Sequence, residues 1–166
     1  VGKTTLVNAL KELEQFKDYN FATERSQHLM SLGIPLNTDS TLKGQTVFLA
    51  ERCGELMHDN IITDRTILDV MAFTMNAKSI PYQDKEAFET YASEFIREYD
   101  HIFYISPHGL EIEDNGVRET DEHYRDLIDF TITTLIKRHG HKAGKINKLS
   151  GSTEERILQI LHFLQS

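Results

Sequence analysis

The chain has 166 residues, of which 39% are hydrophobic and 27% are charged, a composition typical of one folded domain with a single core. Its formal net charge of −8 repels a nucleic-acid backbone, so we do not expect nucleic acid as a partner. The sequence contains neither a run of roughly 18 apolar residues nor a signal-peptide pattern, and we expect a cytoplasmic protein without a membrane partner. Cys53 is the single cysteine, which excludes an internal disulfide.

The first third of the chain alternates helical and strand-like patterns. Apolar residues between Leu6 and Phe16 recur at helical spacing and predict a helix that begins at the opening VGKTTL. A short apolar stretch, residues 19–23, then ends at Glu24. The pattern next predicts a helix from about Thr41 to Met57. The run NIITD, residues 60–64, indicates a short buried strand that ends in a carboxylate.

The remainder continues this alternation. We expect helices at about 67–77, at 84–99 with Asp84 as N-cap, and at 119–139 closed by Gly140. Strands are expected at 101–106 and 145–149, and a last helix follows Ser152, which stands at capping-box spacing from Glu155. Alternating strands and helices predict one α/β domain over residues 1–166, with a mainly parallel sheet covered by helices on both faces.

The opening residues match the second half of a Walker A phosphate-binding loop, G-x-x-x-x-G-K-[ST]. In such a loop, backbone N–H groups surround phosphate oxygens, the lysine reaches the outer phosphates and the hydroxyl binds Mg²⁺. The N-terminus of the following helix adds a partial positive charge. From these roles we predict that the nucleotide is bound by Val1, Gly2, Lys3, Thr4 and Thr5. Lys3 is also a candidate catalytic residue, and Thr4 is also a candidate metal ligand.

A Walker A loop is normally fed by a strand, and no strand pattern precedes Val1. We therefore expect roughly ten further residues upstream, enough for a strand and the first glycine of the loop. An intact mass equal to that of the 166 residues would refute this expectation.

The sequence resembles P-loop nucleoside and nucleotide kinases, in particular the phage and bacterial group of AAA-like ATPase and kinase domains that includes the ribosylnicotinamide kinase domain of the NadR regulator. The resemblance covers most of the chain. It rests on GKTTLVNAL at 2–10, ATER at 22–25, ITDRTILDV at 62–70, DNGVRETDEHYR at 114–125 and LSGSTEERI at 149–157. It implies a three-layer P-loop NTPase fold that uses ATP and Mg²⁺ as cofactors.

In such kinases a carboxylate that ends a strand beside the loop binds Mg²⁺ or activates the acceptor hydroxyl, and Glu24 and Asp64 match that position. Asp64 is also a candidate metal ligand, although it could instead cap the helix after Thr66. The Asp-Arg pair resembles the Asp-Arg-Ser motif of deoxynucleoside kinases. Arg65 would then contact the acceptor or the transferring phosphate; the alternative is a salt bridge to Asp69, which we interpret as structural.

Two arginines are candidates for a helical lid at about 108–126. Arg118 and Arg125 stand seven residues apart, which places them on one face of a helix. Lid arginines of kinases stabilise the charge that develops on the transferred phosphoryl group. The alternative is a solvated helix with acid–arginine pairs. The resemblance further implies that the loop of Gly151, Ser152 and Thr153 contacts adenine, although capping alone explains Ser152.

These patterns favour ATP-dependent phosphoryl transfer to a nucleoside or nucleotide, with ribosylnicotinamide as an alternative acceptor. A regulatory ATPase without such an acceptor is a further alternative, but Arg65 stands where those enzymes place a water-activating glutamate. A GTPase is disfavoured because Ser150 replaces the aspartate of N-K-x-D. Basic residues between Lys137 and Lys148 favour a solvated connection over a nucleic-acid site. Candidates for reading the acceptor's base are Arg25, His28, Phe73 and Tyr82.

Overall fold

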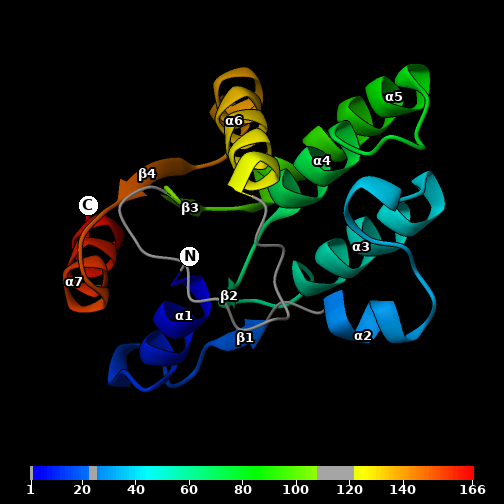
Figure 1. The fold of residues 1–166 in the computed structure, drawn as a ribbon. Helices are drawn as coiled ribbons and strands as arrows, with labels where there is room; N and C mark the ends of the chain where they lie inside the picture. The colour runs from blue at the N-terminus through cyan, green and yellow to red at the C-terminus, as the bar shows by residue number, and fades with distance from the viewer. Residues whose placement is uncertain (1, 23–25, 108–121) are drawn as a thin grey trace.

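The computed structural model describes residues 2–22, 26–107 and 122–166 (Figure 1). Its α-helices are α1 (Lys3–Lys11), α2 (Ser26–Ser31), α3 (Leu42–Glu55), α4 (Ile67–Met75), α5 (Tyr82–Ser93), α6 (Glu122–His139) and α7 (Thr153–Leu164). Its strands are β1 (Asn20–Ala22), β2 (Ile61–Thr63), β3 (His101–Ile105) and β4 (Lys145–Leu149). The predicted alternation of helices and strands is therefore confirmed, and the chain has an α/β fold.

The strands pair differently from the expectation of one mainly parallel sheet. Within the described residues, β1 pairs only with β2 and β3 only with β4, and both pairs are parallel. No backbone ladder joins β2 to β3 in these ranges. Side chains connect the two pairs instead, because Ile62 of β2 and Phe103 of β3 pack against the same apolar cluster. The single-sheet prediction is thus wrong for the described residues, and the three-layer arrangement remains a prediction.

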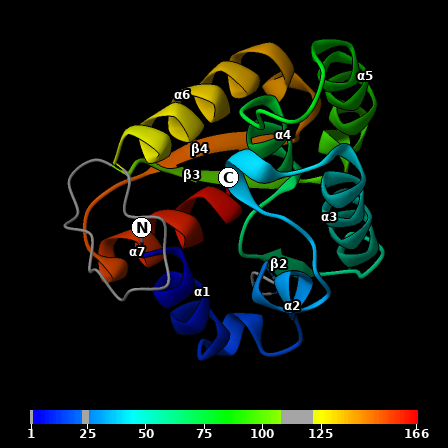
Figure 2. The same ribbon diagram turned by 45° about the vertical axis from the view of Figure 1, so that its right-hand side comes forward.

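Helices cover both faces of the β3–β4 pair (Figure 2). Successive strand residues point to opposite faces, so Ile102 packs into the cluster around α4 and α6 while Phe103 and Ile105 face the cluster around α1 and α7. The Phe103 ring lies 6.2 Å from the ring of Phe163 in α7. This alternation fixes which helices can lie on each side of the strands.

The α1 helix is anchored by the smaller of these two clusters. Its buried members are Leu6, Leu10, Phe16, Leu149 and Ile160, and Figures 1 and 2 both show α1 beside α7. Full burial of such a side chain contributes about 1.5–3 kcal/mol. The start of α1 is therefore held in place by apolar packing along the rest of the helix.

The larger cluster centres on α4, whose Ile67 and Met71 are fully buried. Leu49 of α3, Phe88 of α5 and Ile128 of α6 pack into the same cluster. A helix that is surrounded on several sides is mostly apolar all round, and ILDVMAFTM accordingly has no continuous polar face. The loop that precedes α4 is consequently fixed at the end of β2.

The predicted cap at Ser152 is confirmed, the predicted cap at Asp84 is wrong, and the helix expected from about Thr41 has Thr41 as its N-cap. Thr41 caps α3 by accepting from the N–H of Gly44 at 3.0 Å, and Ser152 caps α7. Asp84 is not the N-cap of α5, because that helix begins at Tyr82 after Pro81. Proline fits a helix start because its fixed φ is already suitable there and no N–H is lost. Asp84 instead lies in the first turn, where a carboxylate complements the helix dipole.

In the three ranges that the structure covers, no helix has both the length and the apolar character needed to cross a membrane.

Candidate functional site

The glycine and lysine of the opening motif form the start of α1. Gly2 is the N-cap residue, and its φ of 75° lies in the left-handed region that favours glycine. Its carbonyl accepts the first helical hydrogen bond from the N–H of Leu6 at 3.0 Å. Lys3, Thr4 and Thr5 therefore occupy the first turn, where backbone N–H groups lack intrahelical acceptors and attract anions.

A hydrogen bond brings this first turn to the end of β2. The hydroxyl of Thr4 donates to Oδ2 of Asp64 at 3.0 Å. Asp64 follows directly after β2, and its N–H extends the β1–β2 ladder by donating to the carbonyl of Ala22 at 2.9 Å. Two residues 60 positions apart in the sequence thus meet at the carboxyl end of the parallel strands.

The Asp64 carboxylate has one oxygen that accepts no hydrogen bond from the part of the chain that the structure describes. The residue is 3% exposed, and its buried Oδ1 has no hydrogen-bond partner among residues 2–22, 26–107 and 122–166. A buried carboxylate oxygen without a donor is costly and needs an explanation. A hydroxyl and a carboxylate are both oxygen ligands of the kind that Mg²⁺ takes together with water and phosphate. Thr4 and Asp64 therefore fit the metal expected from the sequence.

The alternative role of Asp64 as a helix cap is wrong. The N-cap of α4 is Thr66, whose side chain accepts from the N–H of Leu68 at 3.1 Å. Asp69 completes a capping box by accepting from the N–H of Thr66 at 2.8 Å. The structural interpretation of Asp69 is confirmed, and Asp64 is left free of any capping role.

Arg65 lies against an aromatic ring and makes no salt bridge to Asp69. Its guanidinium carbon is 5.4 Å from the centre of the Phe73 ring, and its buried Nε has no hydrogen-bond partner in the described ranges. Its φ of 93° is unusual for a residue with a side chain. The hydroxyl of Thr63 stabilises this turn by donating to the carbonyl of Arg65 at 2.7 Å.

Arg125 lies in the first turns of α6, next to a residue that faces the same aromatic ring. The ring of Tyr124 is 6.5 Å from that of Phe73. The Nε of Arg125 is 3.9 Å from Oδ1 of Asp126, and its Nε and Nη1 are buried without a hydrogen-bond partner among the residues that the structure describes. Arg65, which follows β2, and Tyr124 at the start of α6 thus both lie against Phe73 of α4.

Several predicted residues are not brought to this region or cannot be placed. Val1, Glu24, Arg25, Arg118 and the lid at 108–121 lie outside the described residues. His28 is exposed on α2. Tyr82 is 69% exposed at the start of α5 and donates to Glu86 at 3.2 Å. Among the predicted base-reading residues, only Phe73 is observed beside Arg65.

The loop before α7 has the geometry of a helix cap. The hydroxyl of Ser152 accepts from the N–H of Glu155 at 3.2 Å, and the Glu155 carboxylate accepts from the N–H of Ser152 at 3.4 Å. Gly151 has a φ of 89°, and a Cβ there would lie 2.6 Å from Oε2 of Glu155. Contact of Gly151, Ser152 and Thr153 with adenine stays a prediction.

The basic residues near the end of α6 are paired within the protein. Arg138 donates to Oε1 of Glu89, and Nε2 of His139 lies 3.2 Å from the same oxygen. Lys142 donates to the hydroxyl of Ser93 at 2.9 Å. Arg138, His139 and Lys142 thus contact residues of α5, and the interpretation of the segment as a solvated connection stays a prediction.

No role was predicted from the sequence for two polar residues, Tyr104 and Arg156. Tyr104 of β3 donates to the carboxylate of Asp129 in α6, and burial together with this hydrogen bond raises the pKa of Tyr104 to about 12. Arg156 of α7 is buried with 5% exposure. Tyr104 belongs to no motif, whereas Arg156 lies within LSGSTEERI at 149–157, where no role was expected for it. Its position one turn before Ile160 marks it as facing the core.

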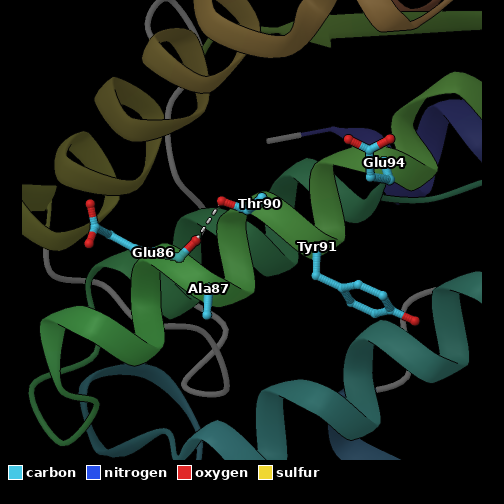
Figure 3. Close-up of a pocket in the computed structure, with 5 residues that line it drawn as sticks. All are labelled: Glu86, Ala87, Thr90, Tyr91 and Glu94. Carbon is cyan, nitrogen blue, oxygen red and sulfur yellow. Dashed lines mark hydrogen bonds between the residues drawn. The ribbon is translucent and has the colours of Figure 1, made fainter.

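Two hollows in the described residues lie apart from Thr4 and Asp64. One of about 740 Å³ separates α3 from the β1–β2 pair, and one of about 630 Å³ follows α5. Figure 3 shows the residues along the second, where the hydroxyl of Thr90 donates to the carbonyl of Glu86 at 3.0 Å. Neither hollow combines the phosphate-binding residue types, so we locate the site at the Thr4–Asp64 contact.

The helix start at Gly2, its contact with the carboxyl end of a parallel strand and the α/β order define a P-loop NTPase-like domain. A protein family described as an AAA domain matches residues 1–156, and the chain belongs to this family. No curated protein and no solved structure matched the chain.

Proposed function

We propose that the protein is an ATP-dependent phosphotransferase that transfers a phosphoryl group from ATP to a nucleoside or nucleotide. The observation that carries the proposal is the hydrogen bond from Thr4 to Asp64, 3.0 Å long. It joins the anion-attracting start of α1 to a buried carboxylate at the end of β2. A triphosphate at the helix start would therefore have a magnesium ligand beside it.

Thr4 and Asp64 would hold the Mg²⁺ ion, which neutralises charge on the phosphate oxygens when it is bound. The spare Oδ1 of Asp64 supports this assignment, because it gives the carboxylate one free buried acceptor. Lys3 would contact the outer phosphates through its ammonium group. Positioning and charge stabilisation then account for catalysis, as is general for phosphoryl transfer.

The acceptor would lie on the side of Asp64 that carries Arg65 and Phe73. The Phe73 ring offers a surface for stacking a base, and the buried Nε of the Arg65 guanidinium beside it has no partner within the described part of the chain. Arg125 at the start of α6 would supply a second cation. Glu24 and Arg118 are proposed to complete the site as acceptor-orienting carboxylate and lid arginine, respectively.

A kinase is favoured over a regulatory ATPase by the residue after Asp64. An ATPase of that kind places a glutamate there to activate water, whereas this chain places Arg65 against an aromatic ring. A cation at this position stabilises negative charge and cannot accept a proton. The arrangement therefore suits an anionic or polar acceptor better than a water nucleophile.

The proposal is tested by measuring ADP release with ATP and Mg²⁺ across a panel of nucleosides, nucleoside monophosphates and ribosylnicotinamide. We expect turnover that depends on one acceptor and that falls at least a hundredfold in Lys3→Ala, because the lysine stabilises the transferring phosphoryl group. The exposed Lys11→Ala, at the other end of α1, is the matched control and should leave turnover unchanged. Turnover equal with and without every acceptor would identify an ATPase and contradict the kinase.

A further inference from the structure

Arg156 is a buried cation for which the described residues supply no partner. It is 5% exposed, and its Nε is buried without a hydrogen bond. No salt bridge to a carboxylate is found for it among residues 2–22, 26–107 and 122–166. A guanidinium carries five N–H donors and keeps its charge at any pH that a folded protein survives.

The other buried arginine of the described residues, Arg52, has a carboxylate partner. Arg52 of α3 is 4% exposed, and its Nη1 donates to both carboxylate oxygens of Glu55 at 3.2 and 3.0 Å. Removing a charge from water without such a partner is strongly unfavourable. Arg156 therefore lowers the stability of the ligand-free protein unless an anion reaches it.

The place of Arg156 on α7 sets which elements its side chain can reach. Arg156 stands one turn before Ile160, so both share the face of α7 that packs on α1 and β4. Helical side chains lean towards the N-terminus of their own helix. For α7 that end follows the carboxyl end of β4, and α1 begins at the carboxyl end of β2.

We propose that Arg156 is a further nucleotide-binding residue, which donates hydrogen bonds to a phosphate of the nucleotide held at the start of α1. The inference rests on the proposed function, since it assumes a nucleotide at that helix start. It adds a ligand contact from α7, which the opening motif does not contain. The bound phosphate supplies the counter-charge that the described residues lack.

The test compares Arg156→Met with wild type in two measurements, the melting temperature without ligand and the Kd for ATP with Mg²⁺. Methionine keeps an apolar stem and removes the unpaired charge. We expect the melting temperature of ligand-free R156M to stay equal or rise, while its Kd increases about tenfold to a hundredfold, the range for a charge-assisted hydrogen bond. R156K, which keeps the charge, should recover part of the affinity.

The control variant is Arg52→Met, which breaks a buried pair remote from the helix start. It should lower the melting temperature and leave the Kd unchanged. A Kd for R156M within threefold of wild type would overturn the inference, as would a loss of ligand-free stability equal to that of R52M. If R156M does not fold, the Kd of R156K for ATP is compared with that of Arg156→Gln, which lacks the charge. Equal Kd values for these two variants would overturn the role of the charge.

The experiments distinguish a failure of the proposed kinase function from a failure of the role proposed for Arg156. Wild type that binds ATP without acceptor-dependent turnover refutes the kinase and leaves the role of Arg156 intact. If wild type binds neither ATP nor GTP, pyrophosphate is titrated against wild type and R156M. Stabilisation by pyrophosphate that R156M loses would support an anion site at Arg156, and its absence in wild type would overturn both proposals.

Discussion

At the scale of single residues, the site depends on polar atoms that the fold buries and leaves unused. Oδ1 of Asp64, Nε of Arg65 and Nε of Arg156 are buried without hydrogen-bond partners within the described part of the chain. The sequence could predict Lys3, Thr4 and Asp64 as candidates, because glycine-lysine-threonine and a strand-ending aspartate are recognisable patterns. It could not predict the contact of Arg65 with Phe73 or of Tyr104 with Asp129, because such pairs depend on three-dimensional packing.

Replacing Asp64 by asparagine tests whether the carboxylate, whose Oδ1 accepts no hydrogen bond in the described residues, serves to bind Mg²⁺. The substitution keeps the shape of the side chain and removes a buried charge that has one hydrogen bond. We expect ligand-free stability to be equal or higher by about 1 kcal/mol, while activity at fixed Mg²⁺ falls at least tenfold. Urea unfolding and the Mg²⁺ dependence of ADP release measure the two effects. Lower stability combined with an unchanged Mg²⁺ dependence would show that Asp64 is structural.

The half-buried phenol of Tyr104 makes stability depend on alkaline pH. Burial and the hydrogen bond to Asp129 raise the pKa of Tyr104 from 10.0 to about 12 in the folded state, so folding favours the neutral phenol. This contribution is complete below the unfolded pKa of 10.0 and is lost as the pH rises towards about 12. Urea unfolding of wild type and Tyr104→Phe between these pH values should show a steeper loss in wild type. Parallel curves would contradict the predicted pKa of Tyr104.

At the scale of elements, local chemistry predicted where helices begin better than how strands pair. Thr41 and Ser152 were predictable as helix starts because a cap bonds to residues two or three positions away. The prediction of Asp84 as the N-cap of α5 was wrong because this helix begins earlier, after Pro81. The pairing of β1 with β2 joins Asn20 to Ile61, and such a distant pairing leaves no local signal.

The capping box of α7 should contribute measurably to stability. Ser152→Ala removes the side-chain acceptor for the N–H of Glu155 and should lower the free energy of unfolding by about 1 kcal/mol. The matched control is Ser150→Ala, because Ser150 bonds to Gln159 through its backbone only. Chemical denaturation of both variants measures the difference. Equal stability of S152A and S150A would mean that the cap makes no net contribution.

At the scale of the whole molecule, two parallel strand pairs are held together by side-chain packing around α1 and α7. The composition and the alternation of elements were sufficient to predict an α/β fold. They were insufficient to separate the strands into two pairs, since both arrangements place the same side chains in an apolar core. The family match over residues 1–156 agrees with the phosphate-loop interpretation of the opening residues.

The central claim is that the start of α1 holds a nucleoside triphosphate with its magnesium ion beside Asp64. Isothermal titration of the protein with ATP, in the presence and absence of Mg²⁺, tests this claim most directly. We predict one binding site per chain, with affinity that Mg²⁺ increases and that Lys3→Ala lowers by at least tenfold. Equal affinity of wild type and K3A, or no binding of ATP to wild type with Mg²⁺ present, would contradict it.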